Sequence, residues 1–305
     1  MSPEPRFPVY IPSKGRADVA LTPHALDRMG VPWLMIVEEQ QRADYARRYP
    51  SERLLTLPRE YQATYHTGDD KGDSLPKGAG PARNFAWDHA IASGAEWHWL
   101  MDDNLRCFAR LHQSQRRTVG DGMVLAAMED FVLRYENIGM AGPQYLKFAP
   151  SREAMKHPYV LNRRIFSCNL IRNDIGLRWR GRWSEDLDLS IQVLRAGWCT
   201  VLFRAFLADK ITTQKIPGGY TDGYLTLSTL PKSQLAAAMN PDIVKVVWRY
   251  HRWHHEADFS EFNDMRLIRK AGWAPPEVNP YAKTHFVPNP AFRQKVNPPV
   301  RGSGA

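Results

Sequence analysis

Short apolar runs alternate with helix-forming stretches over the first 57 residues, and this alternation restricts the fold more than any other feature. Residues 7–12, 33–37 and 54–57 are apolar runs of strand length, as expected for strands covered on both faces. Residues 22–30 and 41–49, which lie between these runs, carry helix signals. The β-α-β-α-β order predicts an α/β half-sheet of the mononucleotide-binding type.

Two common nucleotide-binding motifs do not occur in the chain. No Gly-x-Gly-x-x-Gly follows the first apolar run, which argues against a dinucleotide cofactor. No glycine-rich sequence ending in Gly-Lys-Ser or Gly-Lys-Thr occurs either, so a P-loop nucleoside triphosphatase is excluded.

An acidic turn follows the apolar run at residues 97–101. It consists of Asp102, Asp103 and Asn104, placed where an α/β sheet binds ligands, at the carboxyl end of a buried strand. Carboxylate and amide oxygens suit Mg²⁺ or Mn²⁺ held against phosphate oxygens. The alternative is an ordinary Asp/Asn turn after a strand.

A glycine-flanked helix start precedes this run. Residues 77–84 lead into a helix that carries Arg83 and Asn84 in its first turns, an arrangement that can bind phosphate through backbone N–H groups and a guanidinium. The polar segment 58–80 is long for a compact domain. We expect it to form a mobile flap beside the site, the alternative being a surface insertion.

A second acidic cluster lies at residues 184–188. Ser184 is expected to cap a helix whose first turn carries Glu185 and Asp186. Acidic residues there complement the helix dipole. Three acids in four residues exceed that need, and a carboxylate at a helix start can act as a general base. Other expected elements are a helix over residues 122–135, a hairpin over 159–172 and strands at 138–142 and 199–203.

The C-terminal part of the chain differs in composition. The net charge is +9, and residues 231–305 contain eleven Lys/Arg against six Asp/Glu, with a Trp-Arg-His-rich stretch at 247–255. A basic excess favours a polyanionic partner, nucleic acid first. We therefore expect one domain over residues 1–230 and a basic, aromatic, helical extension over 231–305 that contacts DNA or another acceptor and frays at its end.

Several classes of protein are disfavoured by composition. No window approaches the roughly 18 uninterrupted apolar residues of a membrane span, and the first residues do not form a signal peptide. Three widely spaced cysteines, Cys107, Cys168 and Cys199, indicate a reducing compartment rather than a disulfide framework or zinc site. We expect a cytoplasmic protein without a membrane partner.

The order of these motifs resembles the GT-A fold of nucleotide-sugar glycosyltransferases. More closely, it resembles the TET-associated glycosyltransferase family of bacteriophages and their relatives. The matching segments are residues 10–16, 80–84, 102–104, 184–188 and the Trp-Arg-His tail, and the resemblance spans residues 7 to 270. It implies a GT-A-like, Rossmann-type mixed sheet flanked by helices, with the basic C-terminal helical extension.

The resemblance also implies roles for individual residues. Glu38 or Glu39 would lie near the ribose or base of the donor, which is expected to be a UDP-sugar. Asp102 and Asn104 would hold Mn²⁺ or Mg²⁺ directly or through water, with His254, His251 or His255 completing the site. Asn104 replaces a commoner Asp, so metal affinity would be weaker. Donor-binding residues would be Pro12, Ser13, Lys14, Arg16, Glu38, Arg83, Asn84, Asp102 and Asp103.

The expected activity is sugar transfer to 5-hydroxymethylated pyrimidines in phage DNA, with 5-hydroxymethylcytosine favoured. Asp186 is the first candidate for the acceptor base and Glu185 the second, and a flipped base would stack on an aromatic residue. The tail residues expected on DNA are Arg249, Arg252, Trp253 and His255. The alternatives are a GT-A enzyme acting on glycan, lipid or protein, and an inactive DNA-binding module. The sugar, the base, the stereochemical course and the oligomeric state stay open.

Overall fold

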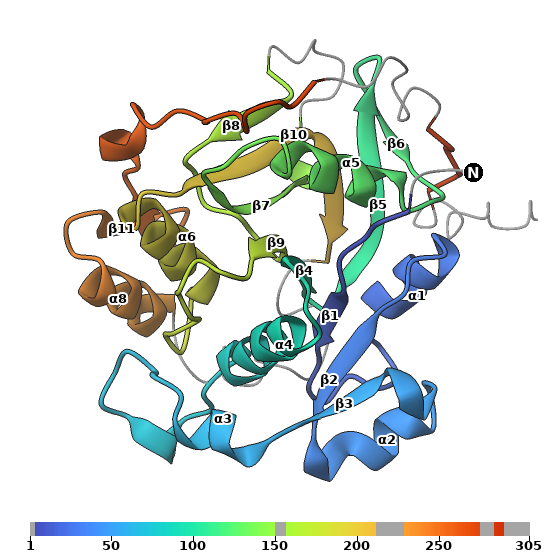
Figure 1. The fold of residues 1–305 in the computed structure, drawn as a ribbon. Coiled ribbons are helices and arrows are strands. Elements are labelled where there is room, and N and C mark those ends of the chain that lie inside the picture. Colours follow the sequence, from blue (N-terminus) through green and yellow to red (C-terminus); the bar gives the residue numbers. More distant parts are fainter. Residues whose placement is uncertain (1–3, 150–156, 212–228, 275–283, 290–305) are drawn as a thin grey trace, which may run out of the picture.

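The sheet at the centre of the molecule is mixed and has ten strands (Figure 1). The computed structural model describes residues 4–149, 157–211, 229–274 and 284–289. The strand order is β3-β2-β1-β4-β9-β7-β10-β5-β6, and β8 pairs with β10. The strands are β1 Val9–Pro12, β2 Leu34–Glu38, β3 Leu54–Leu57, β4 Trp97–Met101, β5 Leu105–His112, β6 Gln115–Thr118, β7 Ile138–Tyr145, β8 Tyr159–Leu161, β9 Cys168–Arg172 and β10 Cys199–Lys210.

Helices cover both faces of this sheet (Figure 1). Helices α1, α2 and α5 contribute to one apolar cluster, and α4 and α6 contribute to a second cluster on the other face. Within β1, Ile11 belongs to the first cluster and Tyr10 to the second, as expected for a strand buried on both faces. The helices are α1 Thr22–Arg28, α2 Arg42–Ala46, α3 Arg59–Ala63, α4 Gly80–Ala92, α5 Met123–Val132, α6 Glu185–Arg195 and α8 Thr229–Met239.

The predicted β-α-β-α-β start is confirmed. Strand β1 lies between β2 and β4 and is parallel to both, and β3 is parallel to β2. Strands β7 and β10 are also parallel to each other. Strands β5 and β9 run in the opposite direction to their neighbours. The carboxyl ends of β1, β4 and β10 therefore meet the amino ends of β5 and β9 at one edge of the sheet.

The hairpin expected over residues 159–172 is wrong. Strand β8 pairs with β10, whereas β9 lies between β4 and β7. Both edges of β9 are already used, so β8 has to pair elsewhere. The antiparallel pair β5–β6 was not expected from the sequence, because its second strand, Gln115–Thr118, is polar and largely exposed.

The extension over residues 231–305 was expected to be helical, and this holds for α8 but is wrong for residues 247–255. This stretch forms a β-hairpin of β11 (Val244–Arg249) and β12 (Arg252–Ala257). Tyr250 and His251 form a two-residue turn with φ of 51° and 58°, which matches the twist of a hairpin. β-Branched and aromatic residues fit paired strands better than a helix. Helix α8 and residues at the base of the hairpin pack on α6 through a third apolar cluster.

The segment expected to be a mobile flap is anchored at its centre. The buried Arg182 side chain forms an ion pair with both carboxylate oxygens of Asp69 at 2.8 and 2.9 Å, and also donates to the carbonyl groups of Gly72, Leu75 and Pro76. Part of the segment is the short helix α3. Because one buried guanidinium joins five acceptor atoms, residues 69–76 are held against the chain that leads into α6.

Candidate active site

A cavity of about 990 Å³ opens at the edge of the sheet where β1, β4 and β10 end. Residues at the starts of α4 and α6 also line it, as do residues 73 and 75–79. Most of the residues predicted to act in the site are brought together here: Pro12, Ser13, Lys14, Arg16, Glu38, Arg83, Asp102, Asp103, Asn104, Glu185 and Asp186 all line the cavity.

Three buried polar atoms in the wall of this cavity have no hydrogen-bond partner among the described residues. They are Nη1 of Arg83, Oδ1 of Asn104 and Oγ of Ser184. Buried polar groups are normally paired, because an unpaired one costs free energy. All three residues line the cavity, so a polar ligand bound there is a candidate partner for these atoms.

Ser184 does not cap α6 as predicted. It has left-handed backbone angles, with φ 57° and ψ 30°, and its side chain makes no capping hydrogen bond. A non-glycine residue in this conformation is uncommon and costs roughly 1–3 kcal/mol when the surrounding structure imposes it. The same backbone geometry leaves the Ser184 hydroxyl without a partner in the cavity wall.

Asp102 lies between two cationic side chains. Its Oδ1 accepts a hydrogen bond from Nη2 of Arg83 at 2.9 Å, and its Oδ2 accepts one from Nζ of Lys210 at 2.7 Å. Burial opposes ionisation of Asp102, but Lys210 and Arg83 outweigh it and hold the pKa of this carboxyl well below its usual range. Arg83 is itself fixed over the Trp179 ring, 4.5 Å from the ring centroid.

Asp103 has different partners from Asp102 and holds the loop after β1. Its oxygens accept hydrogen bonds from Ser13 Oγ at 2.8 Å and from Arg16 Nη1 at 2.7 Å. Burial raises the pKa of Asp103, although Arg16 opposes this shift. Ser13 Oγ also contacts the Tyr45 hydroxyl at 2.8 Å. The predicted donor residues Ser13 and Arg16 are thus set in place by Asp103.

Three other predicted donor-binding residues, Lys14, Glu38 and Asn84, also form structural contacts. Lys14 and Glu38 form an ion pair of 2.7 Å across the ends of β1 and β2. Asn84 exchanges two hydrogen bonds with the backbone of Trp179, at 2.9 and 3.0 Å, and it does not line the cavity. The structure gives Asn84 the role of fixing the Trp179 segment on α4.

The two acids at the start of α6 have different surroundings. Asp186 forms a two-point ion pair with Arg164, at 2.7 and 3.3 Å. Burial alone would raise its pKa, but Arg164 outweighs burial and the pKa lies below the ordinary value. Among the described residues, the Glu185 carboxylate forms no hydrogen bond or ion pair with another side chain. Burial raises its pKa, although the nearby Arg83 charge and a hydrogen bond from its own backbone N–H oppose this shift.

The third acid of the cluster is structural. Asp188 is buried and accepts hydrogen bonds from Arg180 at 2.9 and 3.1 Å, from Gln192 at 2.7 Å and from Asn240 at 3.0 Å. These contacts join α6 to the residues that follow α8. Glu185 is therefore the acid of this cluster whose carboxylate is available to a ligand.

The described donor atoms do not fit a divalent metal ion. Both oxygens of Asp102 are engaged by cations, and those of Asp103 are engaged by Ser13 and Arg16. The amide oxygen of Asn104 has no hydrogen-bond partner among the described residues. Over the same residues, no group of three His, Cys, Asp or Glu side chains could hold a metal. Mg²⁺ and Mn²⁺ need several oxygen ligands. Metal dependence stays a prediction of the family resemblance.

The predicted histidine ligand and the predicted DNA-contacting residues lie on the hairpin. His254 accepts a hydrogen bond from Arg252 and does not line the cavity. His255 contacts Arg164 at 3.2 Å, and burial with the Arg164 charge lowers its pKa to about 3. Arg249 forms an exposed ion pair with Glu256.

The aromatic residues of the hairpin project into solvent. Trp248 and Trp253 face each other across the two strands, with ring centroids 5.1 Å apart. Trp248 remains 56% exposed and Tyr250 at the tip 86% exposed. Because His255 contacts Arg164, and Arg164 lines the cavity, the base of the hairpin adjoins the cavity.

Sequence reasoning missed several residues of the site, above all Arg164 and Lys210. Both are basic residues close to the end of a strand or the start of the next one, at the edge of the sheet that holds the site. That position is a usable signal. Which of the many Lys and Arg residues reach the acidic turn depends on strand order, which the local sequence does not reveal.

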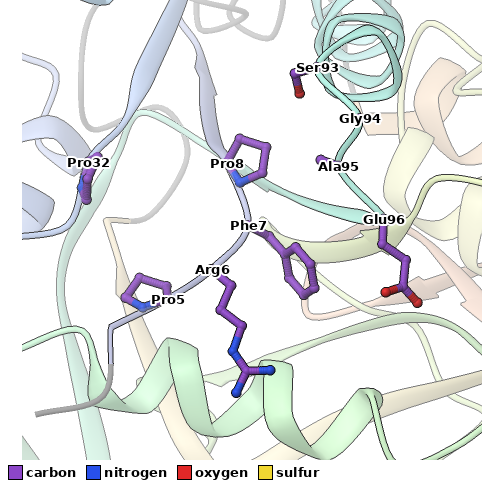
Figure 2. A pocket seen from close by; sticks show the side chains of 9 residues that line it. All are labelled: Pro5, Arg6, Phe7, Pro8, Pro32, Ser93, Gly94, Ala95 and Glu96. Carbon is purple, nitrogen blue, oxygen red and sulfur yellow. The ribbon is translucent and has the colours of Figure 1, made fainter.

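A second hollow, of about 600 Å³, lies near the amino ends of β1 and β4 (Figure 2). Phe7, Pro8 and Glu96 help to line it, and Arg6 turns toward α5, where it pairs with Asp130 at 2.6 Å. In an open α/β sheet ligands bind at the opposite edge. The larger cavity is therefore the candidate active site.

Comparison with known proteins gives one family match. The model of the family described as TET-Associated Glycosyltransferase matches residues 7–219, a range that includes every residue that lines the cavity except Lys232. No curated protein matches the sequence. In the part of the chain that the structure describes, none of the helices has the length and apolar character needed to cross a membrane.

Proposed function

The chain belongs to the TET-associated glycosyltransferase family, and we propose that it transfers a sugar from a nucleotide-sugar donor to 5-hydroxymethylated pyrimidines in DNA. A UDP-sugar is the proposed donor and 5-hydroxymethylcytosine the favoured acceptor base. The observation that supports the proposal is the set of unpaired buried atoms of Arg83, Asn104 and Ser184 in one cavity with Glu185, whose carboxylate forms no hydrogen bond or ion pair with another side chain among the described residues.

The diphosphate of the donor fits the cationic part of the cavity. Nine Lys/Arg side chains and seven Asp/Glu side chains line it, so the wall carries a positive excess that suits a polyanion. Arg83 has unused N–H groups at Nη1, and guanidinium groups bind phosphate through paired hydrogen bonds. Stabilising charge that develops on the departing diphosphate lowers the barrier to transfer.

The acceptor hydroxyl needs a group that takes its proton. Glu185 suits this role better than Asp186, because the Arg164 ion pair lowers the pKa of Asp186 while burial raises that of Glu185. A carboxyl with a raised pKa accepts a proton more readily near neutral pH. We therefore assign the base to Glu185 in this proposal, and Asp186 to holding Arg164 at the cavity wall.

The hairpin supports DNA as the acceptor. Its base adjoins the cavity through His255 and Arg164, and its exposed tip carries Trp248, Tyr250, Arg249 and Arg252. Aromatic side chains stack on unpaired bases, and basic side chains bind phosphates. An acceptor base displaced from the duplex can be held between such a surface and the site. A cytoplasmic location, in an infected bacterial cell if the gene is phage-borne, completes the proposal.

One incubation tests this function. The protein is mixed with DNA that contains 5-hydroxymethylcytosine or 5-hydroxymethyluracil and with a panel of nucleotide sugars. The DNA is then digested to nucleosides, and their masses are measured by mass spectrometry. We expect a mass gain of one sugar residue on one of the two nucleosides. Donor turnover without any DNA product would point to a glycan, lipid or protein acceptor. DNA binding without donor turnover would indicate an inactive DNA-binding module.

A further inference from the structure

Lys210 reaches the acidic turn from a distant part of the chain. It is the last residue of β10, and the β10–β5 register is irregular between Asp209 and Lys210. Its ammonium group donates hydrogen bonds to Asp102 Oδ2 and to the Ser167 hydroxyl. The side chain is 17% exposed. Burial disfavours the charge, but Asp102 outweighs burial and holds the pKa of Lys210 above its usual range.

Arg83 lies on the other side of Asp102 and is buried, with 7% of its surface exposed. One of its terminal nitrogens, Nη2, donates to Asp102, while Nη1 has no partner among the described residues. The single negative charge of Asp102 is thus paired with two cationic side chains, Arg83 and Lys210, and the three side chains form one cluster. The cluster has a net positive charge, and unused N–H donors of Arg83 are buried in the cavity wall.

This arrangement places fixed cations where the sequence led us to expect a metal ion. Each oxygen of Asp102 is engaged by a cationic side chain. A divalent ion at Asp102 would have to displace one of these ion pairs and would then be repelled by the displaced charge nearby. A diphosphate meets the opposite situation, since its oxygens would accept hydrogen bonds from Arg83 Nη1 and the Lys210 ammonium group.

We propose that Lys210 and Arg83, held together by Asp102, bind the diphosphate of the donor and that sugar transfer proceeds without a divalent metal ion. This inference rests on the proposed function. During transfer, the bond between the anomeric carbon and the phosphate oxygen breaks, and its electron pair leaves on that oxygen. The acceptor oxygen forms the new bond to carbon, and its proton passes to Glu185. Lys210 keeps its proton and stabilises the leaving oxygen through a hydrogen bond.

The first test measures binding of nucleoside diphosphates, with UDP as the first probe and GDP, CDP, ADP and dTDP as the others. Calorimetry compares metal-free buffer containing EDTA with buffer containing Mn²⁺, and sugar transfer is assayed in the same two buffers. We expect the affinity and the turnover to agree within about twofold between the buffers. Loss of both in EDTA and their recovery in Mn²⁺ would overturn the proposal.

The second test uses variants of Lys210. Lys210→Met should weaken binding of the same nucleoside diphosphate by about ten- to hundredfold, the usual effect of removing a hydrogen bond to a charged group. Lys210→Arg should recover most of the affinity. Lys270→Met is the matched control, because Lys270 lies outside the cavity, 4.0 Å from Glu96. Unchanged affinity in Lys210→Met, with unchanged melting temperature, would overturn the role of Lys210.

The two tests separate this inference from the function on which it rests. Transfer in Mn²⁺ but not in EDTA leaves the glycosyltransferase function standing and removes the metal-free mechanism. No binding of any nucleoside diphosphate and no donor turnover in either buffer would remove both. Transfer in EDTA that depends on Lys210 supports both.

Discussion

Arg164 contacts both carboxylate oxygens of Asp186, at 2.7 and 3.3 Å, while the neighbouring Glu185 carboxylate has no side-chain partner among the described residues. The two acids are adjacent in sequence and differ in chemistry. A carboxylate that is paired with a guanidinium is stabilised in its charged form and is a poorer proton acceptor. This contrast leads to the first prediction.

Glu185→Gln should lower turnover by at least about a hundredfold, because a general base contributes a hundred- to ten-thousandfold in rate. Donor affinity should stay close to that of the parent. Steady-state kinetics with the identified donor and DNA would measure this.

Asp186→Asn and Asp188→Asn are the matched comparisons for that variant. Each breaks an ion pair, with Arg164 and Arg180 respectively. Each should therefore lower the melting temperature, while turnover should fall much less than in Glu185→Gln. If instead Asp186→Asn were inactive with a normal melting temperature and Glu185→Gln were active, the base would be Asp186, as the sequence suggested.

The dependence of turnover on pH should report the Glu185 carboxyl. Burial raises its pKa above the ordinary value, and a base must be deprotonated to act. Turnover should therefore fall as the pH is lowered through this raised pKa, and the fall should disappear in the residual activity of Glu185→Gln. His255, whose pKa is lowered to about 3, should stay neutral across the range. If turnover of Glu185→Gln still fell as the pH was lowered, a group other than Glu185 would be the one that titrates.

Arg182→Met should destabilise the protein by about 3–5 kcal/mol, the usual cost of removing one partner of a buried ion pair. The variant leaves Asp69 without its counter-charge and frees residues 69–76, so limited proteolysis should cut there. Thermal unfolding and mass spectrometry of the fragments are the measurements.

Arg178→Met is the control for the Arg182 variant. Arg178 pairs with Asp88 at the surface, at 2.7 Å, and exposed pairs contribute only about 0–1 kcal/mol. Similar losses of stability in the two variants would contradict the anchoring role of Arg182.

Replacing Arg249 and Arg252 by Ala should weaken binding to DNA about equally for all sequences. The slope of the logarithm of the binding constant against the logarithm of the salt concentration should also become less steep by about one unit for each lost phosphate contact. Binding of nucleoside diphosphate should not change, because neither residue lines the cavity. Fluorescence anisotropy with labelled duplex at several salt concentrations would measure the slope.

The matched control for the hairpin variant is the double change of Arg47 and Arg48 to Ala. These two residues lie at the end of α2 and form surface ion pairs with Asp44 and Asp18. DNA affinity that falls equally in both double variants would indicate a general charge effect rather than a hairpin site.

Much of the N-terminal half could be predicted from sequence. The bounds of β3 and β4 are as expected, those of β2 are shifted by one residue, and β1 begins two residues later than expected. Local pattern was sufficient there because a strand covered on both faces must be apolar along its whole length. The Tyr250–His251 turn and its hairpin were missed, since neither residue is a typical turn former.

The sequence by itself determined which chemical groups stand at the carboxyl end of β4 and at the start of α6. Only the tertiary structure decided their partners. Lys210 lies 108 residues from Asp102 in the chain, yet it contacts Asp102 directly, and Arg164 separates Asp186 from Glu185 in chemical behaviour. The reason is physical: apolar periodicity follows from local burial, whereas the pairing of charges depends on which strands become neighbours in the sheet.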